Sequence, residues 1–145
     1  MRISDVLRGK SGSVVTVTPD TSVEQLLGVL ADHKIGAAVV SRDGSTVDGI
    51  VSERDVVRSL AVRGSAVLGE PVSAISTPDV FTVAPDATLA DIERLMTERR
   101  FRHVPVVVDG ALRGIVSIGD VVKKRIDELE SERSELAGYI TGERS

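Results

Sequence analysis

The sequence contains an internal repeat, and this repeat limits the folds that the chain can adopt. Residues 16–20 read TVTPD and residues 82–86 read TVAPD, which is an offset of 66 residues. Asp43-Gly44 recurs at the same offset as Asp109-Gly110. A unit of about 60 residues buries too small a fraction of its surface to be more than marginally stable alone. We therefore predict that the two copies pack against each other.

Both copies also share a motif of the form G-h-V-S-x-x-D, where h is an apolar residue. The motif spans residues 49–55 in the first copy and residues 114–120 in the second, an offset of 65 residues. The matching blocks keep the same order in both halves, which indicates duplication rather than chance similarity. We divide the chain into a first repeat at residues 1–66, a second repeat at residues 67–125, and a C-terminal helical tail at residues 126–145.

Each copy predicts the same order of elements. A short extended piece leads through a Pro-Asp turn to a helix whose N-cap is Ser22 or Thr88, with Gln25 or Asp91 as the capping-box partner. An apolar run, an Asp-Gly hairpin turn, a returning strand and a second helix follow. The predicted strands are residues 14–17, 37–40 and 49–51, and residues 80–83, 104–108 and 114–116. The predicted fold class is α/β (α+β), with two pseudo-symmetric β-α-β-β-α units packed through their sheets, plus a C-terminal helix.

Composition argues against several functional classes. The net charge is −4 and aromatic residues make up 2% of the chain, so a nucleic-acid partner is not expected. The chain has no cysteine and two histidines, which excludes disulfides and thiolate metal sites and disfavours a histidine-built zinc site. No signal peptide or membrane span is visible. We predict a cytoplasmic protein with no membrane partner and no bound metal.

The two G-h-V-S-x-x-D junctions are the strongest candidates for a ligand site. Each lies between a strand and a helix, where free N–H groups and the helix dipole favour an anion. Ser52 and Ser117 can contact a phosphate or a ribose, and Asp55 and Asp120 can accept hydrogen bonds from a ribose diol. Arg54 either adds a cation to the first junction or is a solvated arginine. Because Ser-x-x-Asp is also a capping box, both serine–aspartate pairs have a purely structural interpretation as well.

A second candidate is the pair Arg102-His103, which directly precedes a predicted strand. It places two donors at the entrance of that strand, where they can face an anionic group. The corresponding residues of the first copy are Gly36 and Ala37, so the fold itself does not require the pair. The alternative is an exposed arginine with little energetic effect. The asymmetry between the copies favours a functional role.

Threonines occupy equivalent places beside the first extended piece of each copy, at Thr16 and Thr82. Their hydroxyls can read an adenine edge, but threonine is also an ordinary strand residue. The sequence shows no nucleophile–base motif, no P-loop and no G-x-G-x-x-G loop. We therefore predict a binding protein and not an enzyme, with no catalytic residues.

Taken together, these motifs resemble tandem cystathionine-β-synthase (CBS) domains of the small stand-alone bacterial type, a pair known as a Bateman module. The resemblance covers about residues 1–125 and implies a regulatory module that senses AMP, ADP or ATP in clefts between the repeats. In that family the junction aspartates take the ribose, the serines lie near ribose or phosphate, the basic pair contacts phosphates, and strand backbone beside the threonines holds adenine. With Arg54 added from the junction itself, the candidate ligand-binding residues are Thr16, Ala38, Val40, Ser52, Arg54, Asp55, Thr82, Arg102, His103, Val104, Pro105, Val106, Ser117 and Asp120.

The resemblance also implies partners and leaves alternatives. It implies a disk-like homodimer, an unidentified regulated protein, signalling by conformational or oligomeric change, and no required cofactor beyond the regulatory nucleotide. The alternatives are a ligand-independent dimerisation or protein-interaction module, and a binder of another adenosyl ligand such as NAD or S-adenosylmethionine. The first copy departs from the pattern at Gly36-Ala37, and at Val39 where the second copy has Pro105. We expect one of the two clefts to bind phosphate poorly or to stay empty.

The tail carries an apolar stripe with heptad spacing. Ile126, Leu129, Leu136 and Ile140 follow this spacing, with Arg133 interrupting the stripe. One interpretation is a helix that packs on its own module, and another is a dimer contact or a docking face for a partner. Because an arginine weakens a coiled coil, the sequence favours packing within or across a disk-like dimer.

Overall fold

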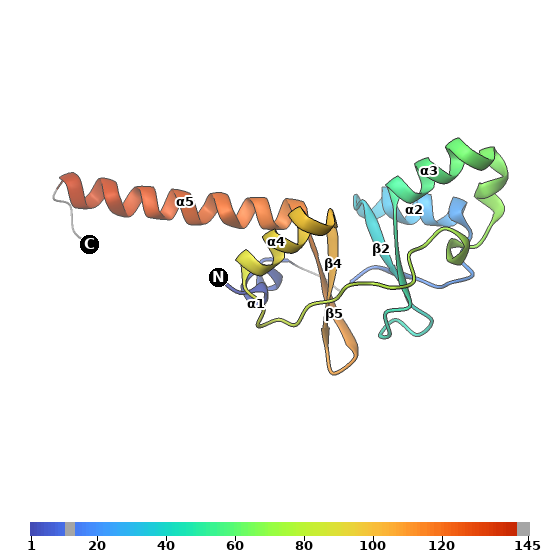
Figure 1. The fold of residues 1–145 in the computed structure, drawn as a ribbon, viewed down its shortest axis with the longest axis horizontal. Helices are drawn as coiled ribbons and strands as arrows, with labels where there is room; N and C mark the ends of the chain where they lie inside the picture. The colour runs from blue at the N-terminus through green and yellow to red at the C-terminus, as the bar shows by residue number, and fades with distance from the viewer. Residues whose placement is uncertain (11–13, 142–145) are drawn as a thin grey trace.

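The computed structural model describes residues 1–10 and 14–141 and confirms the two-unit mixed fold (Figure 1). The first unit consists of β1 (Thr16–Val17), α2 (Val23–His33), β2 (Ala37–Val40), β3 (Gly49–Ser52) and α3 (Glu53–Arg63). The second consists of α4 (Leu89–Arg99), β4 (His103–Val108), β5 (Ala111–Ser117) and α5 (Ile118–Thr141). A short helix α1 (Ile3–Arg8) precedes the first unit, and the 3₁₀ helices η1 (Gly64–Gly69) and η2 (Val72–Ala74) precede the second.

The strands form two small sheets. In the first sheet, of order β1-β2-β3, β1 is parallel and β3 antiparallel to β2, and in the second β4 and β5 are antiparallel. The predicted strand at residues 80–83 is wrong, because only Val83 pairs there, with Val106. Thr77, six residues earlier, pairs instead with Ile50 of the first sheet. This segment crosses from one sheet to the other, so it cannot continue as a strand along either.

The two Asp-Gly pairs give different connections. Asp109 and Gly110 have φ of 51° and 77° and form the tight two-residue hairpin turn expected between β4 and β5. In the first unit the hairpin connection between the antiparallel strands β2 and β3 is the longer loop of residues 41–48, in which Gly44 has φ of 81°. The Asp43 carboxylate accepts hydrogen bonds from the N–H groups of Ser45 and Thr46, at 2.9 and 2.7 Å, and thereby holds the wider loop.

Helix α2 and helix α4 begin where the sequence predicts. The Ser22 hydroxyl accepts the Gln25 N–H at 3.1 Å while the Gln25 side chain accepts the Ser22 N–H. Thr88 and Asp91 form the same reciprocal pair at the start of α4. These capping boxes satisfy amide groups that a helix start would otherwise leave without partners.

Each unit has its own hydrophobic core, and each core includes a segment outside that unit. Helix α1, which precedes the first unit, packs into the core of the second unit, while η1 and η2, which lie between the units, pack into the core of the first. Ile3 and Val6 of α1 are buried with α4, β4 and β5, in the core of the second unit. Val67 and Val72, from η1 and η2, are buried in the core of the first unit. Main-chain hydrogen bonds fix both exchanges, one of them from the Ile3 N–H to the Ala87 carbonyl at 2.9 Å. The N-terminus therefore holds the second unit together.

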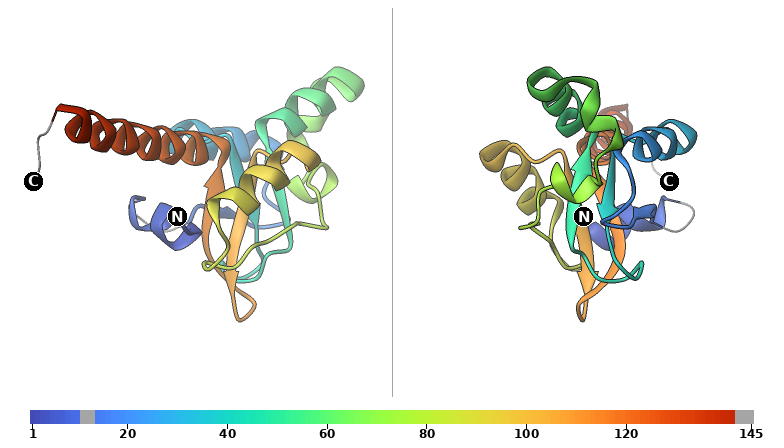
Figure 2. Two further views of the ribbon diagram at one scale, coloured as in Figure 1. Left: turned by 60° about the vertical axis from the view of Figure 1, so that its left-hand side comes forward. Right: turned by 90° about the vertical axis from the view of Figure 1, so that its right-hand side faces the viewer.

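The central strands are buried on both faces. Ala38 and Val40 of β2 lie in the first core. Val39, which points the other way, is 0% exposed, and its counterpart Pro105 in β4 is also fully buried. Helices cover the outer faces, and the strands of both units lie together in the middle of the molecule (Figure 2). Strands buried on both faces are expected where two units pack against each other through their sheets.

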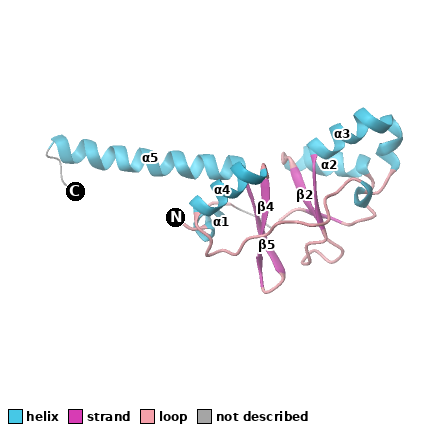
Figure 3. Ribbon diagram, in the orientation of Figure 1, coloured by secondary structure: helices cyan, strands magenta, loops and turns pink. Residues whose placement is uncertain are grey.

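Helix α5 continues without a break from the second unit into the predicted tail. It runs from Ile118 to Thr141 and projects away from the rest of the molecule (Figure 3). Residues 126–141, the described part of the tail, do not fold back onto the module, and the side chain of Ile140 lies outside the described residues. In the part of the chain that the structure describes, no helix is long and apolar enough to cross a membrane.

Candidate functional site

A cleft of about 560 Å³ lies between the two units and is lined by residues of both. From the first unit come Ser52, Arg54 and Asp55, which belong to the first junction motif. From the second unit come Arg102 and His103. Five of the residues singled out in the sequence are thus brought together, and the Arg-His pair lines the cleft at the first junction.

The first junction is a capping box with one carboxylate oxygen to spare. Asp55 Oδ2 accepts the Ser52 N–H at 2.8 Å and the Ser52 hydroxyl at 3.0 Å, and the Asp55 N–H donates to Ser52 Oγ at 3.3 Å. The structural interpretation of Ser52 and Asp55 is therefore confirmed. Asp55 Oδ1 has no hydrogen-bond partner among residues 1–10 and 14–138, so this oxygen can accept a hydrogen bond from a ligand.

Four arginines line the same cleft. Arg54 and Arg58 lie one turn apart on α3, and Arg100 and Arg102 lie in the segment between α4 and β4. Within the described residues, none of the four guanidinium groups forms a hydrogen bond or an ion pair, whereas Arg63 pairs with Glu70. Two carboxylates, Glu53 and Asp55, line the cleft with them. In a chain of net charge −4, the cleft therefore carries a local excess of positive charge.

His103 lines this cleft at the start of β4. Burial, followed by the charge of Lys10, lowers the pKa of His103 below its ordinary value of 6.5, although Asp120 and Glu53 oppose the shift. The imidazole is therefore largely neutral at pH 7 and can donate or accept a hydrogen bond. The charges acting on it come from both junctions, which places His103 between them.

The second junction has the same capping box but a different neighbour. The Ser117 N–H donates to Asp120 Oδ2 at 2.9 Å, and the Lys10 ammonium donates to the same oxygen and to the Ile115 carbonyl, both at 2.8 Å. Burial disfavours ionisation of Asp120, but Lys10 and Ser117 bring its pKa below the usual value. Ile3 and Val72 make equivalent main-chain hydrogen bonds to the two repeats, so Lys10 corresponds to Asp79, and among the described residues no lysine lines the cleft at the first junction.

The other predicted residues lie elsewhere. The side chains of Ala38, Val40, Val104 and Val106 belong to the two cores, and Pro105 is buried on the opposite face of β4. Thr16 lies in β1, opposite Val39 of β2. Thr82 lines a separate hollow of about 430 Å³ that also includes Phe81 and Phe101. A role for these residues in ligand binding remains a prediction.

Sequence reasoning missed several lining residues of the cleft, which are Gly36, Ala37, Ile50, Glu53, Val57, Arg58, Thr77, Arg100 and Phe101. Arg58 could have been found, because it follows Arg54 by one helical turn. Arg100 and Phe101 directly precede the Arg-His pair, so a wider view of that segment would have included them. Thr77 reaches the cleft only because the crossing segment pairs with Ile50, and no local pattern indicates this.

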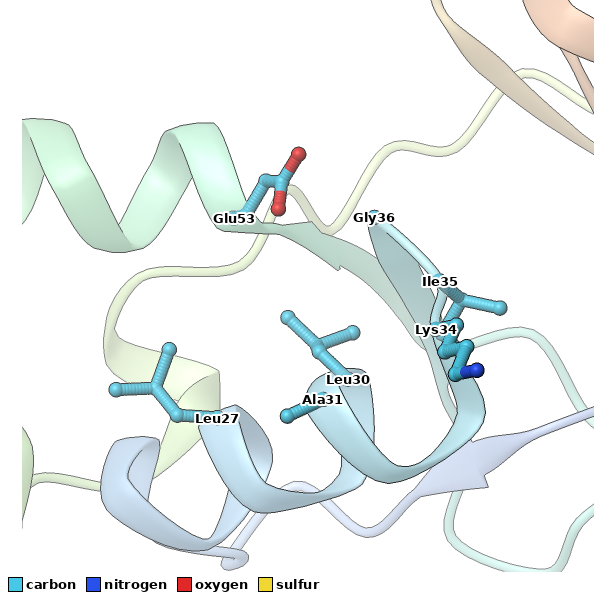
Figure 4. Close-up of a pocket in the computed structure, with 7 residues that line it drawn as sticks. All are labelled: Leu27, Leu30, Ala31, Lys34, Ile35, Gly36 and Glu53. Atoms are coloured by element: carbon cyan, nitrogen blue, oxygen red, sulfur yellow. The ribbon is translucent and has the colours of Figure 1, made fainter.

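A further hollow of about 460 Å³ lies between α2 and the start of α3 (Figure 4). Leu27 and Leu30 form its aliphatic wall, Glu53 stands on the opposite rim, and Lys34 supplies one cation. It shares Gly36 and Glu53 with the arginine-lined cleft but has none of the four arginines. In the described residues no group of three or more potential metal ligands is present. The arginine-lined cleft is therefore the strongest candidate site.

Comparison with known proteins agrees with the repeat. The model of the CBS domain family matches this chain twice, at residues 3–62 and 72–127. Among curated proteins, the CBS domain-containing protein CBSX3 of Arabidopsis thaliana, described as mitochondrial, is 36% identical over 148 aligned positions, covering 97% of this chain and 72% of its own length.

Solved structures show the same fold. The CBS-domain containing protein ATU1752 from Agrobacterium tumefaciens is 45% identical and superposes with a TM-score of 0.83, over 86% of this chain and 99% of that one. The CBS domain protein PAE2072 from Pyrobaculum aerophilum, crystallised with AMP, is 28% identical with a TM-score of 0.74, over 83% and 89% of the two chains. With its duplicated junctions, its paired sheets and these matches, the chain belongs to the CBS-domain family as a tandem pair of CBS domains.

Proposed function

We propose that this chain is a regulatory module, not an enzyme, and that it binds an adenine nucleotide of the AMP, ADP or ATP class in the cleft at Asp55. The observation that carries the proposal is the set of four arginines that share the cleft with the Asp55 carboxylate, where neither the guanidinium groups nor Asp55 Oδ1 have a partner among the described residues. Support also comes from relatives, since PAE2072 and CBSX2, the latter 31% identical with a TM-score of 0.71, were each crystallised with AMP.

The cleft offers a partner for each part of such a ligand. Asp55 Oδ1 can accept hydrogen bonds from a ribose diol while Oδ2 keeps its capping role. Arg54, Arg58, Arg100 and Arg102 supply charge-assisted donors for phosphate oxygens. Ile50, Val57 and Phe101 give the cleft an apolar wall suited to a purine.

The Asp55 cleft is proposed as the tighter of two sites. At the second junction Lys10 already occupies one oxygen of Asp120, and the corresponding entrance residues are Gly36 and Ala37 rather than arginine and histidine. In the repeat, Lys34 and Lys123 stand at the positions of Arg100 and Arg58, but glycines replace the other two arginines of the cleft, Arg54 and Arg102. Phosphate groups therefore gain less electrostatic stabilisation at Asp120 than at Asp55.

Two alternatives differ in the ligand or in the need for one. NAD carries two phosphates and fits the arginine cluster, whereas the sulfonium cation of S-adenosylmethionine gains nothing from it. A ligand-independent interaction module needs no unpaired arginines in a cleft, so their arrangement favours the nucleotide. Binding of NAD in preference to AMP, ADP and ATP would favour the first alternative, and no binding would favour the second.

Regulation is proposed to arise because the cleft is shared. A bound nucleotide would join residues of both units, such as Asp55 and Arg102, and so stabilise one relative arrangement of them. We also propose that the chain forms a homodimer and acts on a separate regulated protein. The exposed apolar side chains on α5, among them Val122 and Leu129, support a dimer contact.

A thermal-shift panel of AMP, ADP, ATP, NAD, S-adenosylmethionine and adenosine tests this function, since a ligand that binds the native state raises Tm by mass action. Asp55→Asn keeps an oxygen for the capping box while removing the charge, and Asp120→Asn makes the same change at the second junction. Asp32→Asn, on the exposed face of α2, is the matched control. We expect AMP, ADP or ATP to shift the wild type, Asp32→Asn and Asp120→Asn strongly and Asp55→Asn weakly. Equal shifts in all four proteins would contradict the site.

A further inference from the structure

The end of α1 lies against the second junction motif. Gly114, the first residue of that motif, has no room for a side chain, because a Cβ there would lie 2.6 Å from the Leu7 side chain of α1. The Lys10 N–H donates to the Leu7 carbonyl at 3.1 Å and continues the turn. The Lys10 ammonium then donates to the Ile115 carbonyl and to Asp120 Oδ2, both at 2.8 Å. Both acceptors belong to the junction, so the ammonium is held at the junction itself.

The first junction is approached in the same way but receives no such cation. A Cβ on its glycine, Gly49, would lie 2.9 Å from the Thr77 carbonyl oxygen. Asp79, the counterpart of Lys10, lines the separate hollow of about 430 Å³ and not the arginine-lined cleft. The two junctions share their motif and their capping box, so the lysine is the difference that acts directly on the carboxylate.

We propose that Lys10 is an internal competitor for the ribose of a nucleotide at Asp120, and that it keeps nucleotide away from the second junction. The inference rests on the proposed nucleotide binding and names the residue that makes this binding asymmetric. The ammonium neutralises Asp120, so the carboxylate offers a ribose hydroxyl a weaker hydrogen bond than an unpaired carboxylate does. Because the lysine belongs to the same chain, it competes at a high effective concentration.

Core packing, and not the ion pair alone, holds the lysine in place. Ile3 and Val6 of α1 are buried in the core of the second unit. The helix therefore delivers the ammonium to Asp120 without the ordering cost that a free ligand pays on binding. Fully exposed ion pairs contribute little, but here the two side chains are only 37% and 23% exposed. The same packing predicts that α1 stays docked when the ammonium alone is removed.

Two substitutions remove the ammonium, and two others serve as controls. Lys10→Ala shortens the side chain, and Lys10→Met keeps its aliphatic stem and so guards against a loss of packing. Lys10→Arg keeps a cation at the position. Lys124→Ala is the matched control, because the Lys124 ammonium also lies beside the end of α1, 3.6 Å from the position of a Cβ on Gly9, but forms no hydrogen bond or ion pair among the described residues.

Isothermal titration calorimetry with adenosine counts the sites in each protein. Adenosine is the suitable probe because it has no phosphate, so the loss of a positive charge does not offset the gain of a free ribose acceptor. We expect one adenosine per chain in the wild type, Lys10→Arg and Lys124→Ala, and two in Lys10→Ala and Lys10→Met. The double variant Lys10→Ala/Asp120→Asn should return to one.

One adenosine per chain in both Lys10→Ala and Lys10→Met would overturn the competition, and so would a second site in the wild type that Asp120→Asn removes. Failure of the proposed function gives a different result. A wild type that binds neither adenosine nor AMP contradicts the site at Asp55, and a site gained at Asp120 in Lys10→Ala would still support the competition. The absence of binding in every variant would overturn both.

Discussion

At the scale of single residues, the candidate site combines side chains that stabilise the fold with side chains that form no hydrogen bond or ion pair among the described residues. Ser52 and Asp55 cap α3, and one oxygen of Asp55 is left over. The arginines of the cleft, by contrast, have no partner among the described residues. Without ion pairs among the described residues these guanidinium groups add little to the stability of the fold, and their grouping in one cleft supports the proposed anionic ligand.

Replacing Arg102 with glutamine tests the phosphate assignment. A hydrogen bond to a charged group contributes about 1.5–3 kcal/mol, so Arg102→Gln is expected to weaken AMP binding about 10-fold or more. Adenosine, which lacks the phosphate, should bind both proteins equally. Arg42→Gln is the matched control, because that guanidinium is exposed and pairs with Asp48 in the loop of residues 41–48. Equal losses for AMP and adenosine would show that Arg102 does not contact phosphate.

The protonation of His103 gives the stability a pH dependence. Because burial lowers its pKa from 6.5, the unfolded chain binds this proton more readily than the folded chain does. Its contribution to stability is full above pH 6.5 and decreases as the pH falls towards the lower pKa of the folded state. Urea unfolding between pH 7.5 and 5.5 should therefore show a steeper loss in the wild type than in His103→Gln. Identical slopes would mean that His103 titrates in the folded protein as it does in the unfolded one.

At the scale of elements, local signals predicted the helix starts and the central strands well. Capping-box residues marked the start of α2 and α4, and the apolar run at residues 37–40 coincides with β2. The strand predicted at residues 80–83 failed because its pairing is set by two sheets that are distant in the sequence. The sequence did not predict that the tail and the last helix of the second repeat form one helix, α5. A heptad stripe indicates which face of a helix is apolar, but not where the helix begins.

Two capping serines provide a comparison between structure and function. Ser22 and Ser52 each accept the N–H of the third helical residue, but only Ser52 lines the cleft. Ser22→Ala and Ser52→Ala should each lower the free energy of unfolding by about 1 kcal/mol, measured by urea titration. Only Ser52→Ala should also weaken AMP binding. If both variants bound AMP as the wild type does, Ser52 would be a helix cap and nothing more.

At the scale of the whole molecule, the duplication predicted the pairing of the units but not how they interlock. The exchange of α1 and of η1–η2 between cores depends on contacts between segments far apart in the chain. The ion pair between Lys10 and Asp120, which are 110 residues apart, is likewise a contact between distant segments. The same holds for Arg58 and Arg100, which line one cleft. Periodicity and capping patterns are local, so they carry no signal for such contacts.

The exchange makes the N-terminus a structural part of the second unit. Ile3 is 0% exposed although it is the third residue of the chain. Ile3→Ala should lower the free energy of unfolding by about 2–5 kcal/mol, as in a protein core. Val62→Ala, at a side chain that is 84% exposed, should change it by about 0.5 kcal/mol or less. Similar small effects at both positions would contradict the exchange of α1 between cores.

The central claim is that a pair of CBS domains with a symmetric fold binds its nucleotide asymmetrically, in the cleft at Asp55. Isothermal titration calorimetry of AMP against the wild type, Asp55→Asn and Asp120→Asn tests this claim most directly. The account predicts one tight site per chain in the wild type and in Asp120→Asn, and its loss in Asp55→Asn. Tight binding that survives Asp55→Asn and disappears in Asp120→Asn would contradict it.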